Sequence, residues 1–258
     1  MYNGVSLQSG TSHYFGQKFS RAYDIKFVNS NNEFDYAYQT SWGVSNRMNG
    51  GLIMVHGDDA GLVLPPKIAP IQVAIIPIGN SESVLELANK YHQKLENAGV
   101  TSYVDTSTKS PGFKFAEAEV SGIPVRIEIG SRDIDNGVVT IARRDTFEKM
   151  TITLDEDITS YVIKLMDEIQ TNLYNRAKER RDKLTFTAST LDEMEKILNK
   201  QPGFIHAAWC GSRECEERIK EIRGCKSRCI LENAELPNEN CVCCGKKAKH
   251  HVVWGIQY

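Results

Sequence analysis

Three features are absent or scarce in this sequence of 258 residues. No run approaches the roughly 18 consecutive apolar residues that a membrane helix needs, and the first residues lack the basic-then-apolar pattern of a secretion signal. An excess of one charge is also missing, since 31 Lys and Arg stand against 33 Asp and Glu, for a formal net charge of −2. We therefore expect no membrane association and no non-specific polyanion binding, so that any contact with nucleic acid must come from local patches.

Cysteine is missing from most of the chain, because all seven cysteines lie between Cys210 and Cys244. Their odd number and their crowding, without a secretion signal, favour thiolate chemistry in a reducing compartment over a disulfide framework. We therefore expect a cytoplasmic protein. The 41% of hydrophobic residues is enough to bury a core, which excludes wholesale disorder.

The pattern of residues divides the chain into three unequal pieces and predicts an α/β fold. Residues 1–66 are rich in Gly, Asn and Ser and hold too few apolar periodic stretches to close a core. Residues 67–175 begin with a strand, a helix and a strand within about 35 residues, which is typical of a parallel βαβ unit. The elements that we expect there are strands at 71–78, 100–104, 123–129 and 138–142, a helix from Ser81 to Gly99 and a long helix at 155–183.

The third piece, residues 176–258, starts with basic residues and is expected to hold four strands. These strands are predicted at 184–187, 204–208, 228–231 and 251–254. The basic residues at the end of the long helix are Arg176, Lys178, Arg180, Arg181 and Lys183. Two interpretations stay open for them: a solvated helix end that complements the helix dipole, and a contact with RNA.

Two closely spaced cysteine pairs predict a metal site in the third piece. Two turns that each present two sulfurs can close a tetrahedron around Zn²⁺, and four protein ligands leave no open position, so the site would be structural. The alternative is a set of buried free cysteines. Cys243 competes for the fourth place, while Cys225 and Cys229 are expected on a helix end and a core strand. The predicted ligands are Cys210, Cys215, Cys241 and Cys244.

The first piece carries a dense polar signature. Residues 8–13, Gln-Ser-Gly-Thr-Ser-His, offer amide, hydroxyl and imidazole groups that suit a small zwitterion. Arg47 can meet a triphosphate with two parallel hydrogen bonds. The same residue types also cap turns and fill loops, so the residues alone leave both interpretations open.

Together, the strings at 8–13, 40–47 and 50–67 closely resemble the third signature region of class II prolyl-tRNA synthetases of the archaeal and eukaryotic cytoplasmic type. The resemblance continues through 111–115, 122–133, 142–145, 209–211 and 241–258, so it covers essentially the whole chain. It implies three domains: the C-terminal part of a class II catalytic domain with its antiparallel sheet (1–66), a five-stranded mixed-sheet anticodon-binding domain (67–175), and a small α+β zinc-binding domain (176–258).

The resemblance also implies roles for individual residues. For ATP or the adenylate, the matching positions are Gln8, Thr11 and Arg47. For the proline pocket, they are His13, Trp42, Gly43 and Ser45. For the anticodon, they are Glu119, Arg126, Arg132 and Asp133. The terminal carboxylate of Tyr258 is implied to fold back toward the active site.

The function implied is proline–tRNA ligation, with ATP–Mg²⁺, L-proline and proline tRNA as partners and a homodimer formed through the catalytic domain. The resemblance starts at the third class II motif. We therefore expect a C-terminal portion of such an enzyme, inactive alone because the first two motifs are missing. The alternative is a stand-alone tRNA-binding module without catalytic activity.

Base recognition gives the anticodon assignment a physical reason. Proline codons begin CC, so a proline tRNA presents two guanines in its anticodon. A carboxylate can accept both N–H groups of the guanine Watson–Crick edge, and a guanidinium matches O6 and N7. Glu119 and Arg126 supply one group each. The alternative is a surface ion pair worth at most about 1 kcal/mol. With either role, we expect replacement of Arg126 to change thermal stability little.

Overall fold

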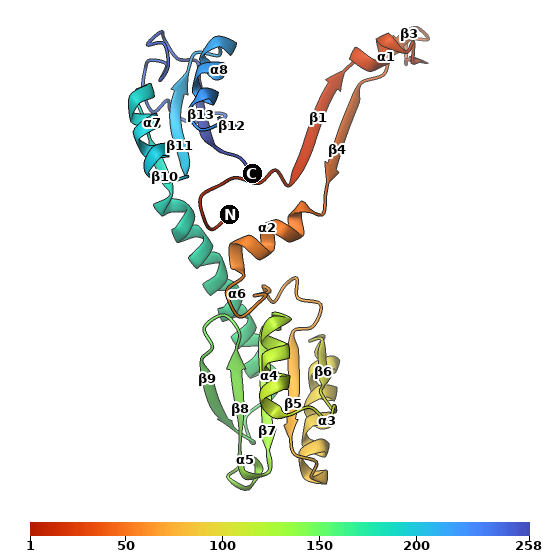
Figure 1. Ribbon diagram of the computed structural model, residues 1–258. Coiled ribbons are helices and arrows are strands. Elements are labelled where there is room, and N and C mark those ends of the chain that lie inside the picture. Colours follow the sequence, from red (N-terminus) through yellow and green to blue (C-terminus); the bar gives the residue numbers. More distant parts are fainter. The chain divides into compact units, whose positions relative to one another are not determined.

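The computed structural model describes residues 1–258, and its contacts divide the chain into two compact units (Figure 1). One unit is formed by residues 52–183 with Tyr2, and the other by Met1 with residues 3–51 and 184–258. The division after residue 183 lies beyond the expected boundary at residue 175, because the long helix α6 (Ile158–Lys183) belongs with residues 52–157 to its last residue. None of the helices combines the length and apolarity that crossing a bilayer requires.

Residues 52–183 contain a five-stranded mixed sheet in the order β6-β5-β7-β8-β9. The central strand β5 (Val73–Ile78) is parallel to β6 (Ser102–Val104) and to β7 (Val125–Gly130). The strands β8 (Val138–Arg143) and β9 (Lys149–Thr153) continue the sheet in antiparallel fashion. The mixed sheet is the one that the resemblance implies, and its apolar runs are buried because helices cover both faces.

The helices of this unit lie on two faces of the sheet (Figure 1). Buried residues of α3 (Glu82–Asn97) and α6 pack with Val73 and Ile75 of β5, while α4 (Pro111–Val120) packs on the opposite face with Ala74 and Ile76. The helix α3 starts after Ser81 and ends before Gly99, as predicted, and Gly99 has a φ of +78°. The short α5 (Ser131–Asp135) follows β7.

Residues 184–258 form a four-stranded sheet in the order β10-β11-β13-β12. Its strands are β10 (Thr185–Thr187), β11 (Phe204–Trp209), β12 (Cys225–Ile230) and β13 (His250–Ile256), close to the predicted ranges. The helices α7 (Leu191–Lys200) and α8 (Arg213–Glu221) were not predicted. Cys225 is buried at the first residue of the edge strand β12 rather than on a helix end, and Cys229 on this strand is exposed rather than in the core.

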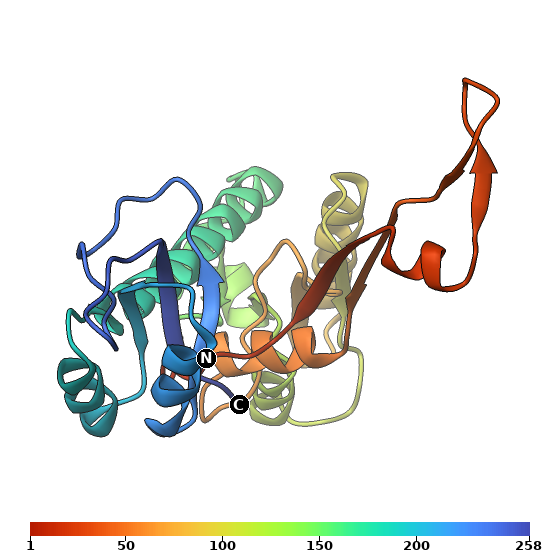
Figure 2. The same cartoon turned by 90° about the horizontal axis from the view of Figure 1, so that it is seen from above.

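Residues 10–44 form a two-stranded ribbon instead of a sheet with a core. The strands β1 (Gly10–Gly16) and β4 (Gln39–Val44) pair only with each other. Figures 1 and 2 show α1 (Lys18–Ala22) and the paired strands β2 (Lys26–Val28) and β3 (Phe34–Tyr36) at the far end of the ribbon. Most of the ribbon side chains are exposed, Trp42 by 81%. The expected piece of a class II catalytic sheet is therefore not confirmed. The helix α2 (Arg47–His56) follows β4.

Candidate nucleic-acid interface and metal centre

A cavity of about 250 Å³ lies where the end of α4 meets β7, β8 and the turn after β8. Its volume is slightly below that of drug-sized ligand sites, which span about 300–1,000 Å³. Two residues predicted to read bases, Glu119 and Arg126, line it. The other lining residues are Ala118, Ile123, Ala142, Arg143, Arg144, Phe147 and Lys149. Four cationic side chains, one carboxylate and one aromatic ring therefore meet at a single small cavity.

Arg126 is held in this cavity by several partners at once. Its Nη1 donates to Glu119 Oε1 at 2.8 Å and its Nε donates to Glu128 Oε1 at 3.0 Å. The guanidinium lies 4.5 Å from the centre of the Phe115 ring. The side chain of Arg126 is 8% exposed and that of Glu119 is 29% exposed. The ion pair of the alternative interpretation is therefore present, but Arg126 is buried, so the pair does not lie on the surface as that interpretation expected. On this geometry we expect replacement of Arg126 to lower stability instead, because the buried Glu128 would keep only Lys149 as a charged partner.

Arg144 joins two segments that are far apart in the sequence. Its Nη1 and Nη2 donate to the two carboxylate oxygens of Asp58 at 2.7 and 2.6 Å, and its Nε donates to the backbone oxygen of Glu119 at 2.9 Å. The hydrogen bonds from Arg144 hold the pKa of Asp58 below its usual value. This bidentate pair fixes the guanidinium beside the cavity. Sequence reasoning missed Arg144 because its partner lies 86 residues away.

A buried carboxylate anchors the turn after β8. The side chain of Asp145 has no exposed surface. It accepts hydrogen bonds from Arg143 Nε and Nη2 at 2.8 Å each and from Asn172 Nδ2 at 2.6 Å. Burial by itself would raise the pKa of Asp145, but the hydrogen bonds from Arg143 and Asn172 hold it below its usual value. The turn is thereby tied to α6.

The other two residues predicted for the anticodon lie elsewhere. Arg132 and Asp133 belong to α5, beyond the end of β7, whereas Arg126 is near the start of that strand. At about 3.3 Å per residue, roughly 13 Å of strand separates Arg126 from Gly130. Asp133 Oδ2 accepts a hydrogen bond from the Gly130 backbone N–H at 3.0 Å. The structure does not bring these two residues to the cavity.

The basic end of α6 is partly engaged in internal contacts. Arg176 Nη1 donates to the backbone oxygen of Asp145 at 3.0 Å, and Arg180 Nη1 donates to that of Val55 at 2.8 Å. Lys178 forms an ion pair of 2.8 Å with Asp182. Arg176 and Arg180 thus bind backbone oxygens of other segments, a role that neither the solvated helix end nor the RNA contact included.

Five of the residues predicted to bind ATP or proline line a second cavity, of about 330 Å³. They are Gln8, Thr11, Gly43, Ser45 and Arg47. His13 and Trp42 are not among the lining residues. The register pairs Ser12 with Trp42 and His13 with Ser41. Because directly opposed residues share a face and faces alternate along a strand, Trp42 lies on the face opposite to His13. The predicted proline pocket is therefore assembled only in part.

The C-terminal residues lie beside the segment that leads to Gln8. The Tyr258 backbone N–H donates to the Ser6 backbone oxygen at 3.0 Å, and Ser6 forms a parallel bridge with Gln257. Arg228 Nη1 donates to Ser6 Oγ at 3.2 Å and to Gln257 Oε1 at 3.0 Å. These contacts fix the backbone of both segments, while Tyr258 itself is 82% exposed.

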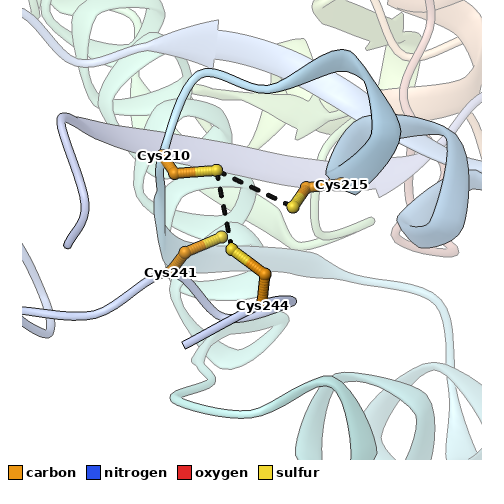
Figure 3. Close-up of side chains that lie close together, drawn as sticks. All are labelled: Cys210, Cys215, Cys241 and Cys244. Atoms are coloured by element: carbon orange, nitrogen blue, oxygen red, sulfur yellow. Dashed lines mark hydrogen bonds between the residues drawn. The ribbon is translucent and has the colours of Figure 1, made fainter. Parts of the chain in front are cut away.

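The four predicted cysteines come together in one cluster (Figure 3). Their sulfurs all lie within 4.8 Å of one another, with 3.7 Å between Cys210 and Cys215 and 3.8 Å between Cys210 and Cys244. Four thiolates placed tetrahedrally at about 2.3 Å from Zn²⁺ would be about 3.8 Å apart. The sulfur spacing therefore fits a single metal ion. Cys243 is not in the cluster and packs against the apolar core of the domain.

Two tight turns present these sulfurs. Cys210 follows β11, and Cys215 lies in the first turn of α8, where Ser212 caps the helix by accepting from the Cys215 N–H. The Cys241–Cys244 turn closes with a hydrogen bond from the Gly245 N–H to the Cys241 oxygen at 3.0 Å, and Gly245 has a φ of +71°. Burial alone would raise the pKa of Cys241, but backbone N–H groups of Cys244 and Cys243 lower it to about 7.

Comparison with known proteins agrees with this geometry. Residues 72–165 match the family described as "Anticodon binding domain", and residues 191–258 match "Prolyl-tRNA synthetase, C-terminal". The chain is 48% identical to a protein named "Proline--tRNA ligase" from Clostridium novyi (strain NT), and 48% identical to one from Ruminiclostridium cellulolyticum. It is 47% identical to "Proline--tRNA ligase 2" from Bacillus thuringiensis (strain Al Hakam).

These alignments cover 100% of the chain and 54% of each relative, so the chain spans about half the length of the curated relatives it matches. The relatives are bacterial and do not support the expected archaeal and eukaryotic subtype. Residues 72–165 are thus an anticodon-binding domain and residues 191–258 a prolyl-tRNA synthetase C-terminal domain, which together identify a C-terminal region of the prolyl-tRNA synthetase family.

Proposed function

We propose that this chain serves in proline–tRNA ligation and that its anticodon-binding domain reads the anticodon of proline tRNA. The observation that carries the proposal is the pairing of Glu119 and Arg126 at 2.8 Å on the wall of one cavity, within a domain of the anticodon-binding family. A carboxylate can accept both N–H groups of the guanine Watson–Crick edge.

The two residues have different parts in this proposal. Glu119 is the more exposed of the pair, so its carboxylate accepts the N–H groups of the base. Arg126 is almost fully buried between Glu119 and Glu128, and it acts by holding the Glu119 carboxylate in position. Preorganisation of this kind lowers the entropy lost on binding. Arg132 and Asp133 are proposed to contact RNA beyond this cavity, with only the resemblance in their support.

For the whole reaction we propose that ATP and proline give prolyl-adenylate and pyrophosphate, and that the prolyl group is then transferred to tRNA. The first step is in-line attack of the proline carboxylate on the α-phosphorus, which depends on positioning and on cationic groups. The cavity shared by Gln8, Thr11 and Arg47 supports their role toward ATP. Gly43 and Ser45 of this cavity are proposed to bind proline. His13 and Trp42 are proposed to do so with only the resemblance in their support, since the register of the ribbon places them on opposite faces. Mg²⁺ would accompany ATP.

We also propose that the cysteine cluster holds one structural Zn²⁺. Burial raises the pKa of the Cys210 and Cys215 thiols, and thiolates this close repel one another, so the four groups would ionise together only around a cation. The ligands would be Cys210, Cys215, Cys241 and Cys244.

Three finer assignments have only the sequence in their favour. They are the homodimer formed through the catalytic domain, the cytoplasmic location, and the archaeal and eukaryotic subtype. The relatives are bacterial and do not support this subtype.

A second candidate function is a tRNA-binding module without ligase activity. It is favoured by a contrast: residues 52–183 carry their own core around the cavity, while His13 and Trp42 lie on an exposed ribbon. Proline-dependent exchange of ATP and pyrophosphate separates the two candidates when it is measured on a protein that joins this chain to the first two class II motifs, because only the ligase proposal then predicts exchange. For the 258-residue chain alone, both candidates predict exchange at background level. Robust exchange by this chain would reject the module and also the expectation that the portion is inactive alone.

Binding of tRNA by the purified chain tests the anticodon proposal. We expect a preference for proline tRNA over the same tRNA with a swapped anticodon, and Glu119→Gln should reduce this preference by about 1–3 kcal/mol. Glu117→Gln is the matched control, because Glu117 lies on the same helix, pairs with Lys109 and does not line the cavity. An unchanged preference in Glu119→Gln would overturn the assignment.

A further inference from the structure

Phe147 has an unusual backbone conformation for an aromatic residue. It lies in the turn between β8 and β9 with a φ of +61°, a region that bulky L-residues rarely adopt. Such strain persists only where surrounding contacts impose it, and it gathers at functional sites. Here the Phe147 N–H donates to the Arg143 oxygen at 3.1 Å, and the Arg143 N–H donates to the Glu148 oxygen at 3.0 Å. The buried Asp145 ties the same turn to α6.

The strained turn leaves the ring both supported and accessible. Phe147 is 49% exposed and lines the same cavity as Glu119. The guanidinium of Arg144 lies 4.8 Å from the centre of the ring, and Asp58 holds that guanidinium with two hydrogen bonds. A cation over one face of an aromatic ring stabilises the arrangement. The ring is therefore a rigid apolar surface beside a polar wall.

We propose that the Phe147 ring is a stacking platform for the unpaired RNA base whose edge Glu119 reads. The inference rests on the proposed anticodon function and deepens it by adding the residue that holds the base. Proteins that read single-stranded RNA stack splayed bases on aromatic side chains while polar groups contact their edges. A base stacked on this ring lies within the cavity that Glu119 and Arg126 also line.

Packing alone does not account for this placement. A residue that only covered Arg144 would gain nothing from a left-handed backbone, and Asn or Gly at position 147 would relieve the strain. The two roles therefore predict opposite results for Phe147→Asn. A stacking role predicts weaker binding with unchanged or higher stability, while a packing role predicts lower stability and binding that follows it.

The test measures the Kd for proline tRNA and the midpoint of thermal unfolding for the 258-residue chain and its variants. We expect Phe147→Asn and Phe147→Leu to weaken binding by roughly 5-fold to 100-fold, and Phe147→Trp to retain it. Phe147→Asn should melt no lower than the wild type. Phe113→Asn is the control, because Phe113 is a comparably exposed aromatic residue, 55%, on α4 outside the cavity.

The outcomes separate this inference from the function on which it rests. If Phe147→Leu and Phe147→Asn bind proline tRNA like the wild type while Glu119→Gln loses its preference, the platform is rejected and the anticodon function stands. If the wild type itself shows no preference for proline tRNA, the anticodon function is rejected. A lower melting point of Phe147→Asn, with binding reduced only in proportion, would assign the ring to packing and overturn the inference.

Discussion

The two domains matched to known families hold their functional groups in place by different means. In residues 52–183, buried charges pair with one another: Arg126 with Glu128, and Arg143 with Asp145. In residues 184–258, the cluster of Cys210, Cys215, Cys241 and Cys244 brings the end of β11 and the start of α8 together with a long segment that has no helix or strand. Within this segment, an isolated bridge between Asn240 and Lys247 closes the turn that holds Cys241 and Cys244. The first site is organised by contacts within the protein, whereas we expect the second to depend on the metal ion proposed for its four sulfurs.

Removal of the proposed metal should have the largest effect on folding, and it should affect one domain and not the other. Chelation is expected to unfold residues 184–258, because the binding free energy of a structural zinc is also folding free energy. Residues 52–183 should stay folded. Intrinsic fluorescence follows the change, since Trp209 and Trp254 both lie in the cysteine-bearing domain and Trp254 is fully buried.

Single cysteine variants sharpen this prediction. Elemental analysis should find one zinc per chain in the wild type and little in Cys244→Ser. The neighbouring Cys243→Ser should keep its zinc, because that side chain packs against the core outside the cluster. Full zinc content in Cys244→Ser, with loss in Cys243→Ser, would show that the fourth ligand was chosen wrongly.

The local patterns of the sequence predict most strands of both domains. Apolar runs such as residues 73–78 are buried on both faces, so their composition alone identifies them. The helices α4, α7 and α8, of nine or ten residues, were missed, although α7 and α8 each bury residues four apart, Met194 with Leu198 and Cys215 with Ile219. The start of α4 was nevertheless readable, with Ser110 as N-cap and Pro111 at its first position.

The candidate site was predictable only where its residues are close in sequence or covered by the resemblance. The spacing of the cysteine pairs predicts the cluster, and the residues that line the 330 Å³ cavity come from the segments 8–13 and 40–47 that carry the resemblance. The position of Trp42 depends on strand register, which pairs it with Ser12 and turns it away from His13. The surroundings of the Phe147 ring include Arg144, which Asp58 holds from 86 residues away, and no local pattern in the sequence predicts a pair so distant.

Replacement of Arg126 should have the next largest effect and tests whether buried charges stabilise the first domain. Arg126→Ala removes a partner from Glu128, whose side chain is 7% exposed. Breaking a buried pair typically costs about 3–5 kcal/mol, because the remaining charge is left buried. Urea unfolding of residues 52–183 measures the loss. Arg132→Ala, at an exposed position, should change the free energy of unfolding by at most about 0.5 kcal/mol. Equal stability of the two variants would contradict the contrast between the domains.

Acidification should have the smallest effect, and it tests the same contrast at Asp145. The pKa of this carboxyl is lower in the folded state than its ordinary value of 3.8, because Arg143 and Asn172 donate hydrogen bonds to it. The contribution of Asp145 is therefore complete above about pH 4 and is lost as the pH falls from there through the folded pKa. Asp145→Asn should lower the free energy of unfolding by roughly 1.5–3 kcal/mol at neutral pH. Below pH 4 its stability should decline less steeply than that of the wild type.

Asp58 and Asp105 also have lowered pKa values, so the informative quantity is the difference in stability between wild type and variant. The exposed Asp135→Asn serves as control and should follow the wild type. If Asp145→Asn declines with acid as steeply as the wild type, the carboxylate does not anchor the turn that presents Phe147.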